Sequence, residues 1–241
     1  MRVRVARVVA RVVLPGLALG LVAAGGQAGT VTGTVVYEGK VPNLKPVSVA
    51  AEPICVKRHA TVPNEVLVLG NGNTMANVLV RVVKGLPAGK TWPAPKEPVV
   101  MNQVGCQYVP HVMGIMVGQP FKVLNGDGIL HNVHALPKVN SQFNMAMPPA
   151  RKEASETFTK EEGMFTIKCD VHPWMQSFMG VFAHPFFVVT KTDGTFSLAN
   201  LDPGTYEIEA WHERLGTQKA TVTVGASDTK SVSFKFAPPA K

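Results

Sequence analysis

Seven consecutive residues read Cys169-Asp170-Val171-His172-Pro173-Trp174-Met175 and separate two strand-like stretches. Within this short span lie a thiol, an imidazole and a thioether, three side chains that can each bind a metal ion. A loop of this length can gather its side chains around one point, because closing few residues costs little conformational entropy. Pro173 restricts the loop further by fixing one backbone dihedral angle and removing an N–H donor. The stretch therefore predicts a metal-binding loop.

The donor set of this loop indicates which metal it would take. Two soft sulfur ligands combined with imidazole select copper, especially where one thioether is a weak axial ligand. A trigonal copper site of this kind requires a second imidazole, which the loop lacks. His131 and His134 are the candidates, in the stretch Ile129-Leu130-His131-Asn132-Val133-His134. Residues three apart in a β-strand face opposite sides, so only one of these two imidazoles should reach the metal.

Taken together, the two stretches resemble the cupredoxin family and its amicyanin- and plastocyanin-like blue copper domains. The resemblance rests on His-Asn-Val, followed downstream by Cys-x-x-His-Pro-aromatic-Met, and on the strand that runs into Cys169. The loop has the short, amicyanin-type interval between its His and its Met. The resemblance covers roughly residues 99–183 and implies a cupredoxin-like Greek-key β-sandwich.

The resemblance also implies one mononuclear type 1 copper ion and a role for each residue by position. The metal ligands would be His131, Cys169, His172 and Met175. Asn132 would lie outside the ligand set and clamp the cysteine loop, since outer hydrogen bonds orient ligands and tune a metal. His134 remains the alternative imidazole and would otherwise lie at the surface or beside the ligands. Met179 is the rival thioether, but its strand-like surroundings predict a core residue.

Other methionines and histidines have less specific surroundings. A Met-rich background is predicted to fill the core, because Met adapts to irregular gaps; the alternative is a thioether surface that receives Cu(I). Its members are Met113, Met116, Met145, Met147 and Met164. The remaining histidines are predicted to be structural, with a second metal site at His111 as the alternative; they are His59, His111, His184 and His212.

The first 28 residues differ in composition from the rest. Four arginines, the last of them Arg11, precede an apolar run, and small residues follow it. This order is typical of a secretory signal peptide, and the run is short for a membrane span of about 20 residues. An uncleaved anchor is the alternative. We therefore expect a periplasmic or secreted protein with no membrane span after cleavage, and a net charge that falls from +8 to +4.

Three cysteines in an exported chain require an explanation. Any of three pairings among Cys55, Cys106 and Cys169 is possible from the sequence. The surroundings of Cys169 favour its use as a metal ligand. That assignment leaves Cys55 and Cys106 to form a disulfide.

The composition predicts an all-β protein. The chain contains 22 glycines and 19 prolines, which indicate many turns, and residues 29–241 show no helical period of ten or more residues. The stretches Asp193-Gly194-Thr195-Phe196 and Pro203-Gly204-Thr205-Tyr206 resemble a carboxypeptidase-regulatory-like β-sandwich. The expected division is a signal peptide at 1–28, an N-terminal β region at 29–98, a copper domain at 99–184 and this small sandwich at 185–241. Whether the N-terminal β region joins the small sandwich stays open.

These features predict a carrier of single electrons between periplasmic redox partners, such as a cytochrome or a dehydrogenase. Electrons would pass through an exposed edge of His172, beside an apolar docking patch formed by Trp174 and Met175. The alternative is a copper-binding or structural module without electron transfer. Scattered Lys and Arg argue against nucleic-acid binding. An enzyme is not expected, because hydrolase and phosphate-binding motifs are lacking and the seven histidines are dispersed.

Overall fold

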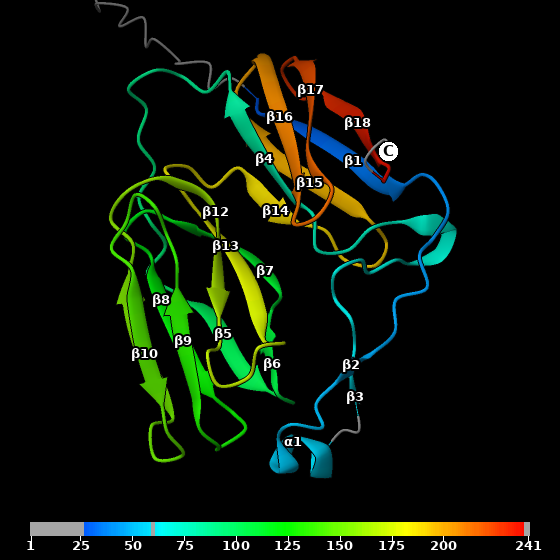
Figure 1. The fold of residues 1–241 in the computed structure, drawn as a ribbon. Coiled ribbons are helices and arrows are strands. Elements are labelled where there is room, and N and C mark those ends of the chain that lie inside the picture. Colours follow the sequence, from blue (N-terminus) through cyan, green and yellow to red (C-terminus); the bar gives the residue numbers. More distant parts are fainter. Residues whose placement is uncertain (1–26, 59–60, 239–241) are drawn as a thin grey trace, which may run out of the picture.

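The computed structural model describes residues 27–58 and 61–238, whose arrangement is shown in Figure 1. The predicted signal peptide lies outside the described residues, apart from its last two positions. The described chain is all-β, as predicted, with a single α-helix of six residues, α1 (Pro53–Arg58). None of the helices in the described part is long and apolar enough to cross a lipid bilayer.

The middle of the chain forms two sheets, which we call the central sandwich. The first sheet consists, in spatial order, of β10 (Phe143–Met147), β9 (His131–Ala135), β12 (Glu162–Lys168), β13 (Gln176–Phe182) and β7 (Val112–Met116). The second consists of β11 (Glu153–Thr157), β8 (Pro120–Asn125), β5 (Val99–Val104) and β6 (Gln107–Val109). Residues from both sheets, among them Met101, Phe121, Val133, Ile167 and Met179, share one buried core. Every second residue of β8 is buried, because successive side chains of a strand point to opposite faces.

Segments before and after the central sandwich in the sequence form a second pair of sheets, the flanking sandwich. One sheet consists of β15 (Thr195–Leu201), β1 (Gly29–Tyr37) and β18 (Thr229–Phe236). The other consists of β14 (Phe187–Val189), β4 (Leu79–Lys84), β16 (Gly204–His212) and β17 (Gly216–Val224). β1 pairs antiparallel with β15 and parallel with β18, so the start of the described chain and its tail belong to one sheet.

Between β1 and β4 the chain leaves the flanking sandwich and reaches one end of the central sandwich, where α1 lies (Figure 1). This excursion contains β2 (Val47–Ser48) and β3 (Thr61–Val62), which pair antiparallel on either side of α1. A disulfide joins Cys55 of α1 to Cys106, in the turn between β5 and β6, which confirms the predicted pairing. We call residues 47–58 the strap.

Candidate metal centre

The predicted metal-binding loop connects β12 to β13, two neighbouring strands of the five-stranded sheet. Two backbone hydrogen bonds close it. The Cys169 N–H donates to the Met175 carbonyl at 3.0 Å, and the Met175 N–H donates to the His172 carbonyl at 2.9 Å. All three residues are at most 2% exposed. The loop therefore buries its sulfur and imidazole side chains.

His131 reaches the loop through strand pairing. It is the first residue of β9, which pairs with β12 in an antiparallel register that sets His134 opposite Lys168. Counting three positions back from His134 along this antiparallel register leads to His131, which therefore lies beside the loop that follows β12. The sheet thus accounts for the meeting of two stretches that are far apart in the sequence.

Three of the predicted ligands converge. The donor atoms of His131, Cys169 and His172 all lie within 4.8 Å of one another, and the residues are buried. The two imidazoles face each other through their Nδ1 atoms, which are 2.9 Å apart, and the Cys169 Sγ lies 3.6 Å from the His172 Nδ1. Among residues 27–58 and 61–238, no other group of three or more His, Cys, Asp or Glu meets this spacing.

The electrostatics of the site favour a thiolate. Burial alone would raise the pKa of the Cys169 thiol, but hydrogen bonds from His131 and His172 outweigh burial and lower the pKa to about 5. The thiolate is the form of cysteine that binds metals. A thiolate and two imidazoles that present the same nitrogen to one buried point form a soft donor set that fits copper.

Asn132 links the two stretches. Its Oδ1 accepts a hydrogen bond from the Asp170 N–H at 2.7 Å and lies 3.3 Å from the Cys169 Sγ. Its Nδ2 donates to the Asp170 carboxylate at 3.1 Å and to the Asn144 Oδ1 at 2.6 Å. These bonds fix the start of the loop against β9.

Asp127 is a residue that sequence reasoning missed. Its side chain is fully buried, and its Oδ2 lies 3.1 Å from the His131 Nε2, on the far side of the ring from the loop. The same carboxylate accepts hydrogen bonds from the Gly105 N–H at 2.8 Å and the Cys106 N–H at 2.9 Å. Burial would raise the pKa of Asp127, but these contacts lower it. The only signal in the sequence was an acidic residue four positions before His131.

The predicted exposure of His172 is wrong. The residue is 1% exposed, and Met175, expected in an apolar docking patch beside it, is also 1% exposed. The rings of Trp174 and His172 pack at a tilt of 50°, with centroids 5.3 Å apart, and the Trp174 indole N–H donates to the Cys106 carbonyl at 3.0 Å. The strap lies over this side of the site, and the Glu52 Oε2 is 3.6 Å from the His172 Nε2. No motif in the strap indicates that a segment so far away in the chain covers the loop.

The alternative residues lie elsewhere. The Nδ1 of His134 is 2.9 Å from the Asp170 carboxylate, and the side chain is partly exposed, outside the group of three. Met179 is fully buried in the core of the central sandwich. The Met-rich background also behaves as predicted: Met113, Met116, Met145 and Met147 are buried, and Met164 packs partly buried against a smaller cluster.

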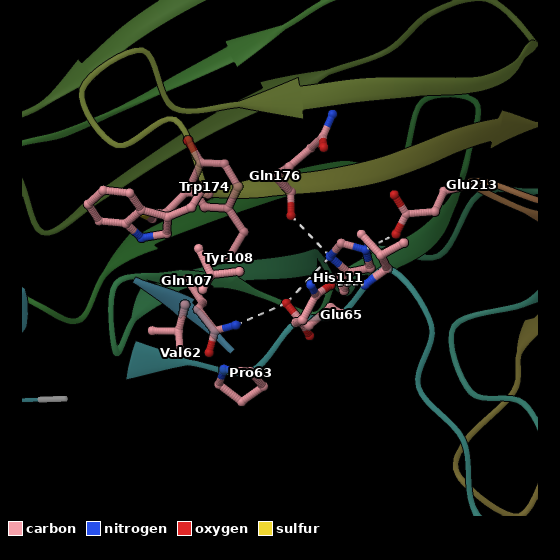
Figure 2. Close-up of a pocket in the computed structure, with 13 residues that line it drawn as sticks. Val62, Pro63, Glu65, Gln107, Tyr108, His111, Trp174, Gln176 and Glu213 are labelled. Carbon is pink, nitrogen blue, oxygen red and sulfur yellow. Dashed lines mark hydrogen bonds and ion pairs between the residues drawn. The ribbon is translucent and has the colours of Figure 1, made fainter. Parts of the chain in front are cut away.

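A cavity beside Trp174 and Met175 contains a second group of titratable residues, drawn in Figure 2. The His111 Nε2 lies 2.6 Å from the Glu213 carboxylate, and its Nδ1 lies 3.1 Å from the Gln176 carbonyl. Glu65 approaches the same ring at 3.5 Å. His111 thus joins the central sandwich to the chain after β3 and to the turn after β16, which agrees with its predicted structural role.

No family model and no curated protein matches the sequence. Among solved structures, a copper-containing nitrite reductase from Thermus scotoductus is 23% identical over 42% of this chain and 26% of its own, with a TM-score of 0.34. An amicyanin variant in the Cu(I) state is 23% identical over 35% of this chain and 82% of its own, with a TM-score of 0.32. A purple cupredoxin from Nitrosopumilus maritimus is 20% identical over 34% of this chain and 98% of its own, with a TM-score of 0.29. The chain thus spans about a quarter of the nitrite reductase, and each match covers less than half of this chain.

Proposed function

We propose that this chain is an exported type 1 copper protein that carries single electrons between redox partner proteins. The copper ligands would be His131, Cys169, His172 and Met175. The observation that supports this proposal is the convergence of one thiol and two imidazoles within 4.8 Å in a buried loop. A carrier needs no substrate cavity, and we propose no catalytic residue.

Each residue has a defined task in this proposal. Cys169 binds as a thiolate, which its low pKa favours at neutral pH. His131 and His172 bind through Nδ1, the nitrogen that each turns toward the other. Met175 follows on the same closed loop and would supply the thioether. Bound copper would supply one-electron chemistry by alternating between Cu(II) and Cu(I).

The residues around the ligands restrict movement. Asn132 holds the Cys169 end of the loop, and Asp127 holds the outer nitrogen of His131. The ligands are buried in or beside a packed core, so water is excluded from them. A ligand set held in this way rearranges little when its charge changes, and this is the property that a carrier of single electrons requires.

The burial of His172 favours a second candidate function. An electron carrier with an exposed ligand can dock that ligand against its partner, whereas here the strap separates His172 from solvent. A copper-binding or structural module without electron transfer is therefore the alternative. The two candidates share the same ligands and differ in whether the copper exchanges electrons.

The visible and EPR spectra of the protein with one equivalent of Cu(II) test the site. We expect an intense thiolate-to-copper absorption and a narrow copper hyperfine splitting. Cys169→Ser should abolish the absorption, whereas the matched control His134→Ala should keep it because His134 lies outside the group. A colourless wild-type protein would overturn the proposed site.

Once the copper colour is established, voltammetry decides between the two candidate functions. A reversible one-electron wave supports the electron carrier, and its absence supports the copper-binding or structural module.

A further inference from the structure

His172 has one buried nitrogen whose hydrogen bond is missing. Its Nδ1 faces His131 and Cys169, whereas its Nε2 is buried without a hydrogen-bond partner. A buried N–H without an acceptor costs about 1–3 kcal/mol, so such atoms are rare in folded proteins. The Glu52 Oε2, 3.6 Å away, is just beyond hydrogen-bond distance.

The Glu52 carboxylate is held in place by the strap itself. Its Oε1 accepts a hydrogen bond from the Ile54 N–H at 3.2 Å, at the start of α1. The Glu52 N–H donates to the Val49 carbonyl at 3.0 Å, and the Glu52 carbonyl accepts from the Val56 N–H at 3.0 Å. One carboxylate oxygen is therefore used within the strap, and the other is left facing His172.

The strap is in turn fixed to the metal centre. Val49 and Cys55 of the strap form a small buried cluster with Cys106 and Ile129, against which Trp174 packs. The disulfide ties α1 to Cys106. Cys106 also donates its N–H to Asp127, the partner of the other imidazole. One cross-link thus connects the segment that carries Glu52 to the turn whose N–H groups hold the Asp127 carboxylate.

We propose that Glu52 is a positioning residue for His172, and that the tethered strap closes this side of the copper site. The inference rests on the proposed function. With copper on the His172 Nδ1, the Nε2 would carry the proton, and the Glu52 carboxylate, 3.6 Å away, would accept its hydrogen bond. A carboxylate on the outer nitrogen of a ligand histidine fixes the ring and makes the ligand more basic. Both imidazoles then have a carboxylate behind them.

The variant Glu52→Gln separates this role from a merely structural one. Glutamine keeps an oxygen that can accept from the Ile54 N–H, so α1 keeps its first hydrogen bond. The negative charge behind the His172 Nε2 is lost. We expect Cu(II) affinity, measured against a competing chelator, to fall by about 10–100-fold, and the reduction potential to rise. The matched control Glu153→Gln removes a carboxylate that is 62% exposed and lies on β11, away from the ligands; it should leave both values unchanged.

Chemical labelling tests the closure on the unaltered, copper-loaded full chain. Diethyl pyrocarbonate should modify His172 more slowly than the partly exposed His134, because the strap covers the former. Replacing both Cys55 and Cys106 by Ser should speed the labelling of His172 alone. Equal labelling of His172 and His134 in the wild-type protein would overturn the closure, whether or not the double variant folds.

A wild-type protein that shows the copper colour while Glu52→Gln changes neither affinity nor potential would overturn this inference and leave the proposed function intact. Absence of the colour would overturn both.

Discussion

The two imidazoles of the metal centre are supported in different ways. Behind His131 stands Asp127, four residues away in the chain, with a fully buried side chain at 3.1 Å. Behind His172 stands Glu52, which belongs to a remote segment, is 28% exposed and lies at 3.6 Å. The support behind His131, which we call the Asp127 wall, is therefore part of the central sandwich itself. The support behind His172, which we call the strap wall, is added by a remote segment that a small cluster and one disulfide hold against the central sandwich.

The difference between the Asp127 and Glu52 carboxylates indicates which side of the site is rigid and which side can change. A local, buried carboxylate with several donors is fixed as soon as the central sandwich folds. A carboxylate on a remote strap depends on long-range contacts, and local opening of such segments generally costs less free energy than opening of the core. We therefore expect His131 to be the more strongly held ligand and His172 to be the ligand through which access is controlled.

The largest effect is expected from the Asp127 wall. Asp127→Ala leaves the N–H groups of Gly105 and Cys106 and the His131 Nε2 without this acceptor. Breaking a buried charged network by removing one partner typically costs about 3–5 kcal/mol. The free energy of unfolding of the metal-free protein, measured in urea, should fall by this amount. Asp127→Asn keeps the shape and an acceptor oxygen and should cost less. Equal costs for the two variants would contradict the network.

Removal of the cross-link that ties the strap to Cys106 should have the next largest effect on stability. The disulfide closes a loop between residues 51 positions apart in sequence. Replacing both Cys55 and Cys106 by Ser should lower the free energy of unfolding by about 2–4 kcal/mol, chiefly because the unfolded chain gains freedom. Calorimetry of the metal-free protein gives the value. A loss larger than that of Asp127→Ala would contradict the expected order and show that the cross-link contributes more to stability than the Asp127 network.

The same difference explains what could be predicted from the sequence. Cys169 and His172 lie on one short loop, so their spacing alone indicated that they come together, and the His-Asn-Val stretch supplied His131 and Asn132. The exposed edge of His172 was predicted wrongly, because its cover comes from a segment that carries no recognisable motif. Glu52 and Asp127 were missed for a related reason: an acidic residue becomes a partner of a histidine only through tertiary packing. The disulfide was predictable because Cys169 already had another use.

The smallest change in the free energy of unfolding is expected at Glu162, which lies away from both walls and whose contribution depends on pH. Glu162, at the start of β12, accepts hydrogen bonds from the N–H groups of Lys138, Val139 and Asn140. Burial would raise the pKa of the Glu162 carboxyl, but these bonds outweigh it and lower the pKa from 4.5. The carboxylate therefore stabilises the fold fully above about pH 4.5, and this contribution is lost as the pH falls through the lowered folded-state pKa.

Glu162→Gln should cost about 1–2 kcal/mol at pH 7, since the loop N–H groups lose a charged acceptor. Urea unfolding at pH 7 and pH 3 should show the gap between wild type and variant narrowing at the lower pH, and a gap that stays constant would contradict the assignment. Because the residue touches neither wall, the copper spectrum of the variant should match that of the wild-type protein.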